Sequence, residues 1–268
     1  MVILKTKEEI ELLRISNQIV AKILKELKRV ISPGVTTKEI DALVEEMIKR
    51  EGGESSFKGY RNYPASICIS INDEVVHGIP GNKKMKEGDI VSLDLGVKVD
   101  GFCGDAAITF PVGEISETAE RLIEVTEDAL YCGIGKAKIG NRLFDISHAI
   151  QTLVESAGLS VVRDFVGHGV GRNQHEDPQI PNYGLPNTGL RLQEGMTLAI
   201  EPMVNLGTWR VRVNEKDKWT VTTADGMLSA HFEHTIAITQ NGPDILSLLP
   251  EDINEKKEKL LKYDLLSP

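Results

Sequence analysis

Apolar residues recur at helical spacing near the start of the chain. Between residues 6 and 30 they follow a period close to 3.6, and Thr6 with Glu9 matches the capping-box pattern of a helix start. The Pro-Gly pair at 33–34 should end this helix. The same periodicity returns at 37–48 and stops before a Gly-Gly pair. The pattern therefore predicts two consecutive amphipathic helices.

This helical pair is repeated when the sequence is shifted by 106 residues. Two turn glycines and three apolar helix positions then superpose, namely Gly34 on Gly140, Ile40 on Ile146, Met47 on Leu153, Ile48 on Val154 and Gly52 on Gly158. The first long helix falls on 116–138, and strand-like sequence follows each pair, at 66–71 and at 160–166. We therefore expect a single domain over 1–268 with an internal repeat of about 6–110 and 112–239. Amphipathic periodicity alone could also produce these matches.

The second half of the chain adds further strand-like segments. Short runs with alternating or apolar patterns predict strands at 196–201, 209–213, 219–223 and 228–239. The proline-rich stretch 175–192 is typical of a surface loop. The charged stretch 251–262 predicts a short helix or frayed end, so 251–268 is expected to be a C-terminal tail. Paired helices beside antiparallel strands predict an α+β fold made of two ααβ halves around one curved sheet.

The stretch 90–110 predicts a tight hairpin. Two alternating, β-branched runs flank Asp100-Gly101, and Gly tolerates the positive φ that a two-residue turn requires. In that register Asp94 faces Ala107, so Asp94 and Asp105 share one face, with Cβ atoms somewhat under ~7–8 Å apart. Two carboxylates in apolar surroundings raise each other's pKa, and a cation would let both stay ionised. On the hairpin alone, each Asp could instead cap a turn or face water.

Composition narrows the classes of protein. The chain has 268 residues, 41% hydrophobic and 26% charged, which is typical of a globular protein with a sizeable core. With a net charge of −9 and no basic block, nucleic acid is not expected as the primary partner. Cys68, Cys103 and Cys132 form no CxxC pattern, which favours a reducing compartment, and we expect a cytoplasmic protein. The apolar run 1–4 is too short for a signal peptide, and no membrane span is expected.

Three later segments each place one ligand-type residue in apolar surroundings. His168 lies between two glycines, Glu201 precedes a proline, and Glu233 lies in an alternating strand. Each alone is a weak sign of function. The order Asp94, Asp105, His168, Glu201, Glu233 is far more specific, and it resembles the methionine aminopeptidases of the pita-bread fold, from the first helix to about residue 239. The resemblance implies that fold, one catalytic domain, and these five residues as metal ligands.

Four carboxylates and one imidazole form a donor set for divalent ions. Such a set is too acidic for copper or an iron–sulfur cluster, and it suits two ions of Co, Mn, Fe or Zn per chain. A pair of ions lowers the pKa of a shared water toward ~7 and polarises a scissile carbonyl, which leads to peptide hydrolysis. The resemblance gives Glu201 a second, catalytic task, because its family counterpart handles the proton of the attacking water.

Other histidines differ in what the resemblance assigns to them. His77 and His175 match family residues that contact the substrate and stabilise the tetrahedral intermediate, although a core position for His77 stays open. His148 matches no family role and is interpreted as structural. On an alternating strand His231 would share the face of Glu233. The family gives His231 no ligand role, so we consider it only as a group that could support the ligands.

The side-chain pocket is expected from aromatic and sulfur-containing residues. The resemblance implies that the substrate methionine contacts Tyr60, Tyr63, Cys68, His77 and Trp219, and such surfaces suit a thioether. Core packing is the alternative for each. Two positions depart from many bacterial members. Phe57 stands where those have Cys, and Gln174 stands where they have an aromatic residue before His175. These departures concern the pocket rim rather than the ligands.

The resulting hypothesis is a type I dinuclear-metal aminopeptidase that removes the initiator methionine from nascent proteins when the second residue is small. Glu201 and Glu233 are only 32 positions apart, which leaves no room for the large insert of the second type. An Xaa-Pro peptidase and a non-catalytic binding protein of the same fold are the alternatives. The expected partners are nascent polypeptide N-termini, with ribosome contact left open, and the expected state is a monomer.

Overall fold

The structure is a computed structural model that describes residues 1–254 and 258–260. Helices and short 3₁₀ turns (η) alternate with groups of strands along the chain. In order, the elements are α1 (Lys7–Leu27), α2 (Thr37–Arg50), β1 (Glu54–Ser55), η1 (Tyr60–Asn62), β2 (Cys68–Ile71), β3 (Glu74–Val76), β4 (Ile90–Val99), β5 (Phe102–Pro111), α3 (Glu117–Gly135), α4 (Leu143–Ser156), β6 (Ser160–Val161), β7 (Gly167–Gly169), β8 (Glu176–Ile180), β9 (Thr197–Ile200), β10 (Met203–Asn205), β11 (Val211–Val213), β12 (Val221–Thr223), β13 (Ser229–His231), β14 (Glu233–Thr239), β15 (Gly242–Ile245) and η2 (Pro250–Asp252).

The helices begin where local sequence signals place them, but α1 ends at Leu27, before the Pro-Gly pair expected to end it, and α3 ends at Gly135 instead of 138. A capping box starts α1 at Thr6 and α2 at Thr36, so that side chains satisfy N–H groups of the first turn. Both ends of α4 lie 106 residues after those of α2, which is the offset expected from the sequence. Gly52 and Gly158 follow these two helices with φ of +76° and +78°. An origin of the halves by duplication, and a single-domain organisation, stay predictions.

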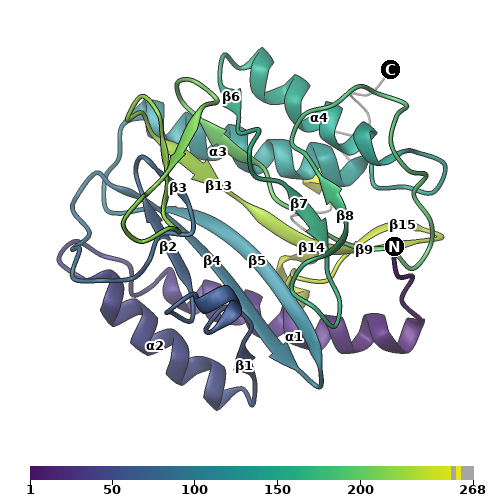
Figure 1. Cartoon of the computed structure of the whole chain (residues 1–268), viewed down its shortest axis with the longest axis horizontal. Helices are drawn as coiled ribbons and strands as arrows, with labels where there is room; N and C mark the ends of the chain where they lie inside the picture. The colour runs from purple at the N-terminus through teal and green to yellow at the C-terminus, as the bar shows by residue number, and fades with distance from the viewer. Residues whose placement is uncertain (255–257, 261–268) are drawn as a thin grey trace.

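Among the described residues, nine strands form one sheet in which every pairing is antiparallel. The order is β1-β4-β5-β14-β9-β7-β8, with β2 also paired to β4 and β15 to β14. Two smaller sheets, β13-β10-β6 and β11-β12-β3, flank it. Figure 1 shows the long curved strands β4 and β5 beside α1 and α2, with α3 and α4 in the other half of the molecule. The α+β class with a curved antiparallel sheet is therefore confirmed.

Each helix pair covers its own apolar cluster. Val20 and Ile40 from α1 and α2 are fully buried with residues of β2, β4 and β5. In the other half, Leu130 and Ile146 from α3 and α4 are buried with Leu198 of β9 and neighbouring strands. The amphipathic stripe of each helix thus faces the sheet, because burying it there removes apolar surface from water. This leaves the opposite face of the central strands for polar residues.

The hairpin of β4 and β5 has the predicted register. Its two turn residues, Asp100 and Gly101, have φ of +49° and +82°, as a type I′ turn requires. Asp94 pairs with Ala107, and Gly96 with Asp105. The two aspartates therefore lie on one face of adjacent strands, as the sequence indicated.

Three sequence expectations were wrong in part. The stretch 175–192 is not all loop, because β8 pairs with β7 inside it. The strand predicted at 160–166 is shorter than expected, because it pairs with β10 only through Ser160 and Val161; the N–H of the next residue, Val162, donates to the carbonyl of Met203 at 2.9 Å. The strand predicted at 228–239 is broken at Phe232, whose N–H turns to the carbonyl of Pro202 at 3.3 Å. β13 and β14 consequently belong to different sheets.

The chain end is described only in part. The short 3₁₀ turn η2 lies at the start of the predicted tail, and most of the tail's remaining length, 255–257 and 261–268, lies outside the described residues. Within the described part of the chain, no helix combines the length and apolar character that crossing a membrane requires.

Candidate metal centre and substrate cavity

A cavity of about 560 Å³ opens above the polar face of the central strands. Its walls bring together all the residues that the sequence predicted for the site. They are Asp94, Asp105, His168, Glu201, Glu233, His77, His175, Tyr60, Tyr63, Cys68 and Trp219.

Strand register explains how acids far apart in the sequence converge. Asp94 on β4 pairs with Ala107 on β5, and Ala107 pairs with Glu233 at the start of β14. Glu201 directly follows β9, which also pairs with β14, and His168 on β7 pairs with β9. Ala107 thus lies between Asp94 and Glu233 across the three strands, and its methyl side chain fills little of the space between these two acids. The ligand-type residues therefore surround one open volume.

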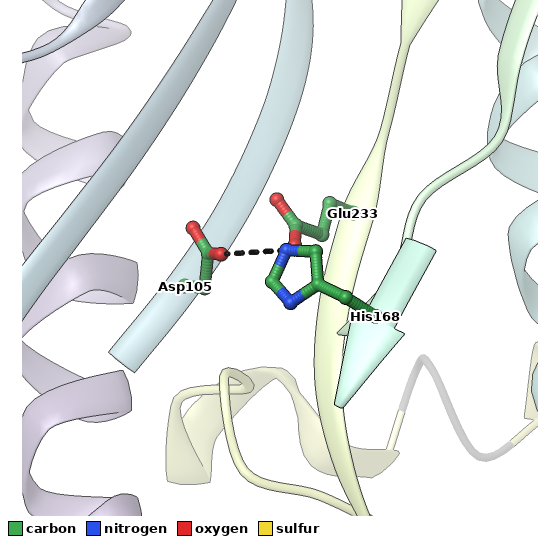
Figure 2. Close-up of side chains that lie close together, drawn as sticks. All are labelled: Asp105, His168 and Glu233. Atoms are coloured by element: carbon green, nitrogen blue, oxygen red, sulfur yellow. Dashed lines mark ion pairs between the residues drawn. The ribbon is translucent and has the colours of Figure 1, made fainter. Parts of the chain in front are cut away.

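Three of these residues form a tight cluster. Ligand atoms of Asp105, His168 and Glu233 all lie within 4.8 Å of one another, and Figure 2 shows their side chains directed toward one another. His168 Nε2 is 3.6 Å from Asp105 Oδ2 and 3.5 Å from Glu201 Oε1. Asp94 lies outside this tight group but lines the same cavity.

The Gly-His-Gly motif fixes the orientation of His168. Its Nδ1 lies 2.9 Å from the carbonyl of Gly169, and because a carbonyl only accepts, Nδ1 carries the proton and the lone pair of Nε2 faces the carboxylates. Both glycines are required by close backbone approach. A Cβ on Gly167 would lie 2.5 Å from the carbonyl oxygen of Ala199, and one on Gly169 would lie 2.1 Å from that of Asp177.

Burial perturbs every titratable group of the cluster. It raises the pKa of Asp94 to about 7 and raises those of Asp105, Glu201 and Glu233 well above their ordinary values, with the neighbouring carboxylates adding to the shifts at Asp105 and Glu233. Burial also lowers the pKa of His168 to about 3, so this imidazole is neutral at physiological pH. A neutral imidazole is the form that ligates metals.

The buried acids fit a divalent cation. Three carboxylate oxygens, Asp94 Oδ1, Asp105 Oδ1 and Glu233 Oε1, are buried with no hydrogen-bond partner. Such unpaired acceptors cost free energy, and divalent cations bound beside them would satisfy them. Carboxylate oxygens with a single imidazole nitrogen suit Mn, Fe, Co or Zn. The donor set present in this chain therefore fits a divalent metal ion.

An apolar pocket adjoins the cluster. The rings of Tyr63 and Trp219 meet edge to face with centroids 5.1 Å apart, and His77 meets Trp219 in the same way at 5.9 Å. Cys68 is buried with Tyr63, and it pairs with Asp94 across β2 and β4. Burial raises the pKa of the Cys68 thiol well above its ordinary value, so the pocket keeps a neutral sulfur. The pocket thus lies one strand away from Asp94, one of the acids that line the cavity.

Two histidines line the cavity near this pocket. His77 has a φ of +60°, a left-handed conformation that is uncommon for a non-glycine residue and concentrates at functional sites. Burial lowers its pKa to about 4. The ring of His175 lies 4.3 Å from that of His168 and 5.1 Å from that of Tyr60, measured between centroids, and burial lowers its pKa as well. Both imidazoles are therefore neutral near pH 7.

Sequence reasoning missed several residues at this site. Arg61, Val166, Glu176, Asp177 and Gln179 also line the cavity. Glu176 could have been expected at the site, because it directly follows His175, a predicted site residue. Arg61 takes a left-handed φ of +47°, and no local sequence pattern predicts that conformation.

Two further contacts to the acids come from residues that the sequence analysis had noted without assigning them to the site, Gln174 as a departure and His231 as a group that could support the ligands. The amide of Gln174, noticed only as a departure from the family pattern, donates to Asp105 Oδ2. His231 places Nε2 3.7 Å from Glu201 Oε2, whereas the ring of His234, on the other side of the strand, lies 2.9 Å from the Tyr131 hydroxyl through its own Nε2.

Known proteins resemble this chain over almost its whole length. The profile of Metallopeptidase family M24 matches residues 11–240. The methionine aminopeptidase of Clostridium perfringens is 55% identical over 249 residues, 93% of this chain and 100% of that protein. Methionine aminopeptidase 1 of Bacillus subtilis is 56% identical over 247 residues, 92% of this chain and 99% of that protein.

A solved structure agrees with these sequences. The crystal structure of methionine aminopeptidase from Thermotoga maritima is 52% identical, with a TM-score of 0.91 over 93% of this chain and 100% of that one. The pita-bread fold inferred from the order of acids and histidine is thereby confirmed, and so is the enzyme class, a metallo-aminopeptidase hydrolase. The chain belongs to metallopeptidase family M24 and, within it, to the methionine aminopeptidases.

Proposed function

We propose that this chain binds two divalent metal ions and removes the initiator methionine from nascent proteins whose second residue is small. The observation that carries the proposal is the meeting of two features in one cavity: buried acids with unpaired oxygens, and an apolar pocket that contains sulfur and aromatic rings. The first feature suits metal ions and the second suits a thioether side chain. The names of the relatives support the same substrate.

In this proposal the five ligand-type residues hold the metals, which are Co, Mn, Fe or Zn. The ligands are Asp94, Asp105, His168, Glu201 and Glu233. When bound, such ions supply Lewis acidity, which lowers the pKa of a water and polarises a peptide carbonyl. Asp105, His168 and Glu233 already have ligand atoms within 4.8 Å of one another, so they require little rearrangement to share an ion.

The proposed catalytic groups are Glu201, His77 and His175. Glu201 accepts the proton of the attacking water and returns it to the leaving amine, which is the task of a carboxylate beside the reacting atoms. Because burial keeps His77 and His175 neutral, each can donate one hydrogen bond to the oxygen on which negative charge develops. The ring contact of His175 with His168 holds that donor beside the metal cluster.

The proposed substrate contacts beyond the histidines are Tyr60, Tyr63, Cys68 and Trp219. The side chain of Tyr63 is held in place at its hydroxyl, which lies 2.9 Å from the carbonyl of Gly78 and 3.2 Å from that of Ile67. A wall held in this way can select a side chain by shape. The restriction to a small second residue rests on the family resemblance.

We further propose that the protein acts as a cytoplasmic monomer on emerging polypeptide N-termini. All three cysteines are free, which suits a reducing compartment.

Peptide hydrolysis under defined metals tests the function. Purified protein, first stripped of metal, would be given Mn, Co, Fe or Zn and incubated with Met-Gly-Met-Met, with the same peptide carrying Phe at the second position, and with an Xaa-Pro peptide. We expect free methionine only from the first peptide. Hydrolysis of the Xaa-Pro peptide alone would favour the proline-specific alternative, and metal binding without hydrolysis would favour the binding protein. Calorimetric titration checks the expected stoichiometry of two ions.

A further inference from the structure

A buried histidine, His231, lies close to Glu201, the residue proposed to carry the proton. His231 is only 1% exposed, and its Nε2 is 3.7 Å from Glu201 Oε2. The other oxygen of that carboxylate, Oε1, is 3.5 Å from His168 Nε2. Glu201 is thus bracketed by two imidazoles, one from the metal cluster and one that does not line the cavity formed by the described residues.

The backbone of His231 is held by the aspartate-bearing hairpin. The His231 N–H donates to the hydroxyl of Thr109 at 2.9 Å, and that hydroxyl donates to the carbonyl of His231 at 2.8 Å. Because the Thr109 proton is used in this way, Ser92 must be the donor in the 2.8 Å contact between their hydroxyls. Ser92 and Thr109 are cross-strand partners on β4 and β5. His231 is therefore anchored to the strands that carry Asp94 and Asp105.

The side chain of His231, unlike its backbone, has an unsatisfied polar atom. Its Nε2 is buried and has no hydrogen-bond partner within normal distance, which is costly for a polar atom. Glu201 Oε2 is an acceptor 3.7 Å from it, and a shortening of this distance by a few tenths of an ångström would complete a bond. Hydrogen bonds in active sites are often long until the complete complex forms. An N–H that faces a carboxylate oxygen can only donate to it.

We propose that His231 is a positioning residue that donates from Nε2 to Glu201 Oε2 and thereby keeps Oε1 directed toward the metal cluster. The inference rests on the proposed function, in which Glu201 both binds metal and carries a proton. Without the donor, the carboxylate can rotate about its last bond and present either oxygen. Groups that orient a metal ligand in this manner affect metal affinity or activity by about 10–100-fold.

Two polar substitutions separate this role from simple packing. In His231→Gln the amide nitrogen reaches as far as Nε2, whereas in His231→Asn it stops one bond short. A matched control is His234→Gln, because His234 is three residues along the chain and its ring contacts Tyr131 and Ser247 instead of Glu201. Each variant would be measured for kcat and KM on Met-Gly-Met-Met, for melting temperature, and for affinity of the metal-free protein for Co by calorimetry.

We expect His231→Asn to lower kcat about 10–100-fold, to leave KM within about twofold, and to weaken Co binding about tenfold, whereas His231→Gln stays within about threefold of the wild type in each. The His234→Gln control should keep kcat and Co affinity even if it melts lower. Equal kcat and Co affinity in the Asn and Gln variants would overturn the proposal. If the wild type releases no methionine, the proposed function fails, but the Co titrations still decide the role of His231.

Discussion

Removal of divalent metal should lower the melting temperature of this protein. Asp94, Asp105, Glu201 and Glu233 are buried around one cavity, and three of their oxygens lack a hydrogen-bond partner. An ion that binds only the folded chain adds RT ln(1 + [L]/Kd) to its stability, about 2.7 kcal/mol at a hundredfold excess over Kd. At roughly 2–4 °C per kcal/mol for a chain near this size, we expect chelated protein to melt about 5–10 °C below the metal-loaded form.

The same four acids give this difference a definite pH dependence. Burial raises the pKa of Asp94 from 3.8 in the unfolded chain to about 7 in the metal-free fold, and the other three shift the same way. A group with a raised pKa in the folded state binds a proton on folding, so its stabilising contribution is present below pH 3.8 and is lost as pH rises through 7.

Bound metal acts in the opposite direction. It requires ionised carboxylates, and protons compete with it for the same oxygens, so its stabilisation grows as pH rises. The gap in melting temperature between metal-loaded and chelated protein should therefore be smallest at pH 5 and largest at pH 8. Groups away from the site, such as Glu45 with its lysine partners, titrate equally in both samples and cancel in the difference.

Differential scanning calorimetry at pH 5, 6, 7 and 8, with either a chelator or excess Mn, measures this gap directly. Asp105→Asn is a matched variant of nearly the same shape. It should abolish activity and most of the metal-induced gap, while its chelated form melts no more than a few degrees below chelated wild type. A gap that is absent, or that is constant over this pH range, would refute the reasoning and with it the proposed ligand set.

Other substitutions test single contacts. His175→Ala should lower kcat about 10²–10³-fold, the size expected for one oxyanion donor, with metal content by mass spectrometry unchanged; loss of metal would instead make it a ligand. Cys68→Ala or Trp219→Ala should broaden the first residue accepted, because shape discriminates by only ~1–3 kcal/mol per methylene; an unchanged preference for Met over Leu counts against the pocket. Lys5→Met leaves the buried Glu176 carboxylate without its partner at 2.6 Å and should cost about 3–5 kcal/mol in urea unfolding; a loss under about 1 kcal/mol contradicts this.

Local signals in the sequence predict much of the fold. Thr6 and Thr36 start helices because their side chains bond to the first turn, and Asp100-Gly101 sets the register of β4 and β5 because the turn needs two positive φ values. Once that register is fixed, Asp94 and Asp105 must share a face. The order of ligand-type residues then completes the candidate site through family resemblance.

The remaining features depend on contacts between distant segments. The break at Phe232 and the pairing of β8 with β7 are set by which strands lie alongside, and alternation within one segment carries no information about its neighbours. Likewise the contacts of Gln174 with Asp105 and of His231 with Glu201 join residues that are 69 and 30 positions apart. The periodicity of a segment indicates on which face of a helix or strand a side chain lies, but it does not indicate which atoms of other segments that side chain contacts.

The sheet also sets the spacing between specificity and chemistry. Cys68, Asp94, Ala107 and Glu233 are successive cross-strand partners on β2, β4, β5 and β14. Neighbouring strands lie ~4.7–4.9 Å apart, and backbone hydrogen bonds hold that distance. In the proposed reaction the methionine side chain is bound beside Cys68 and its carbonyl reacts near the acids, so the separation of pocket and metal ligands is a property of the sheet. A substitution that slips the register of β2 against β4 by one residue would turn Cys68 away from the pocket. Selectivity and catalysis therefore depend on the same backbone pairing.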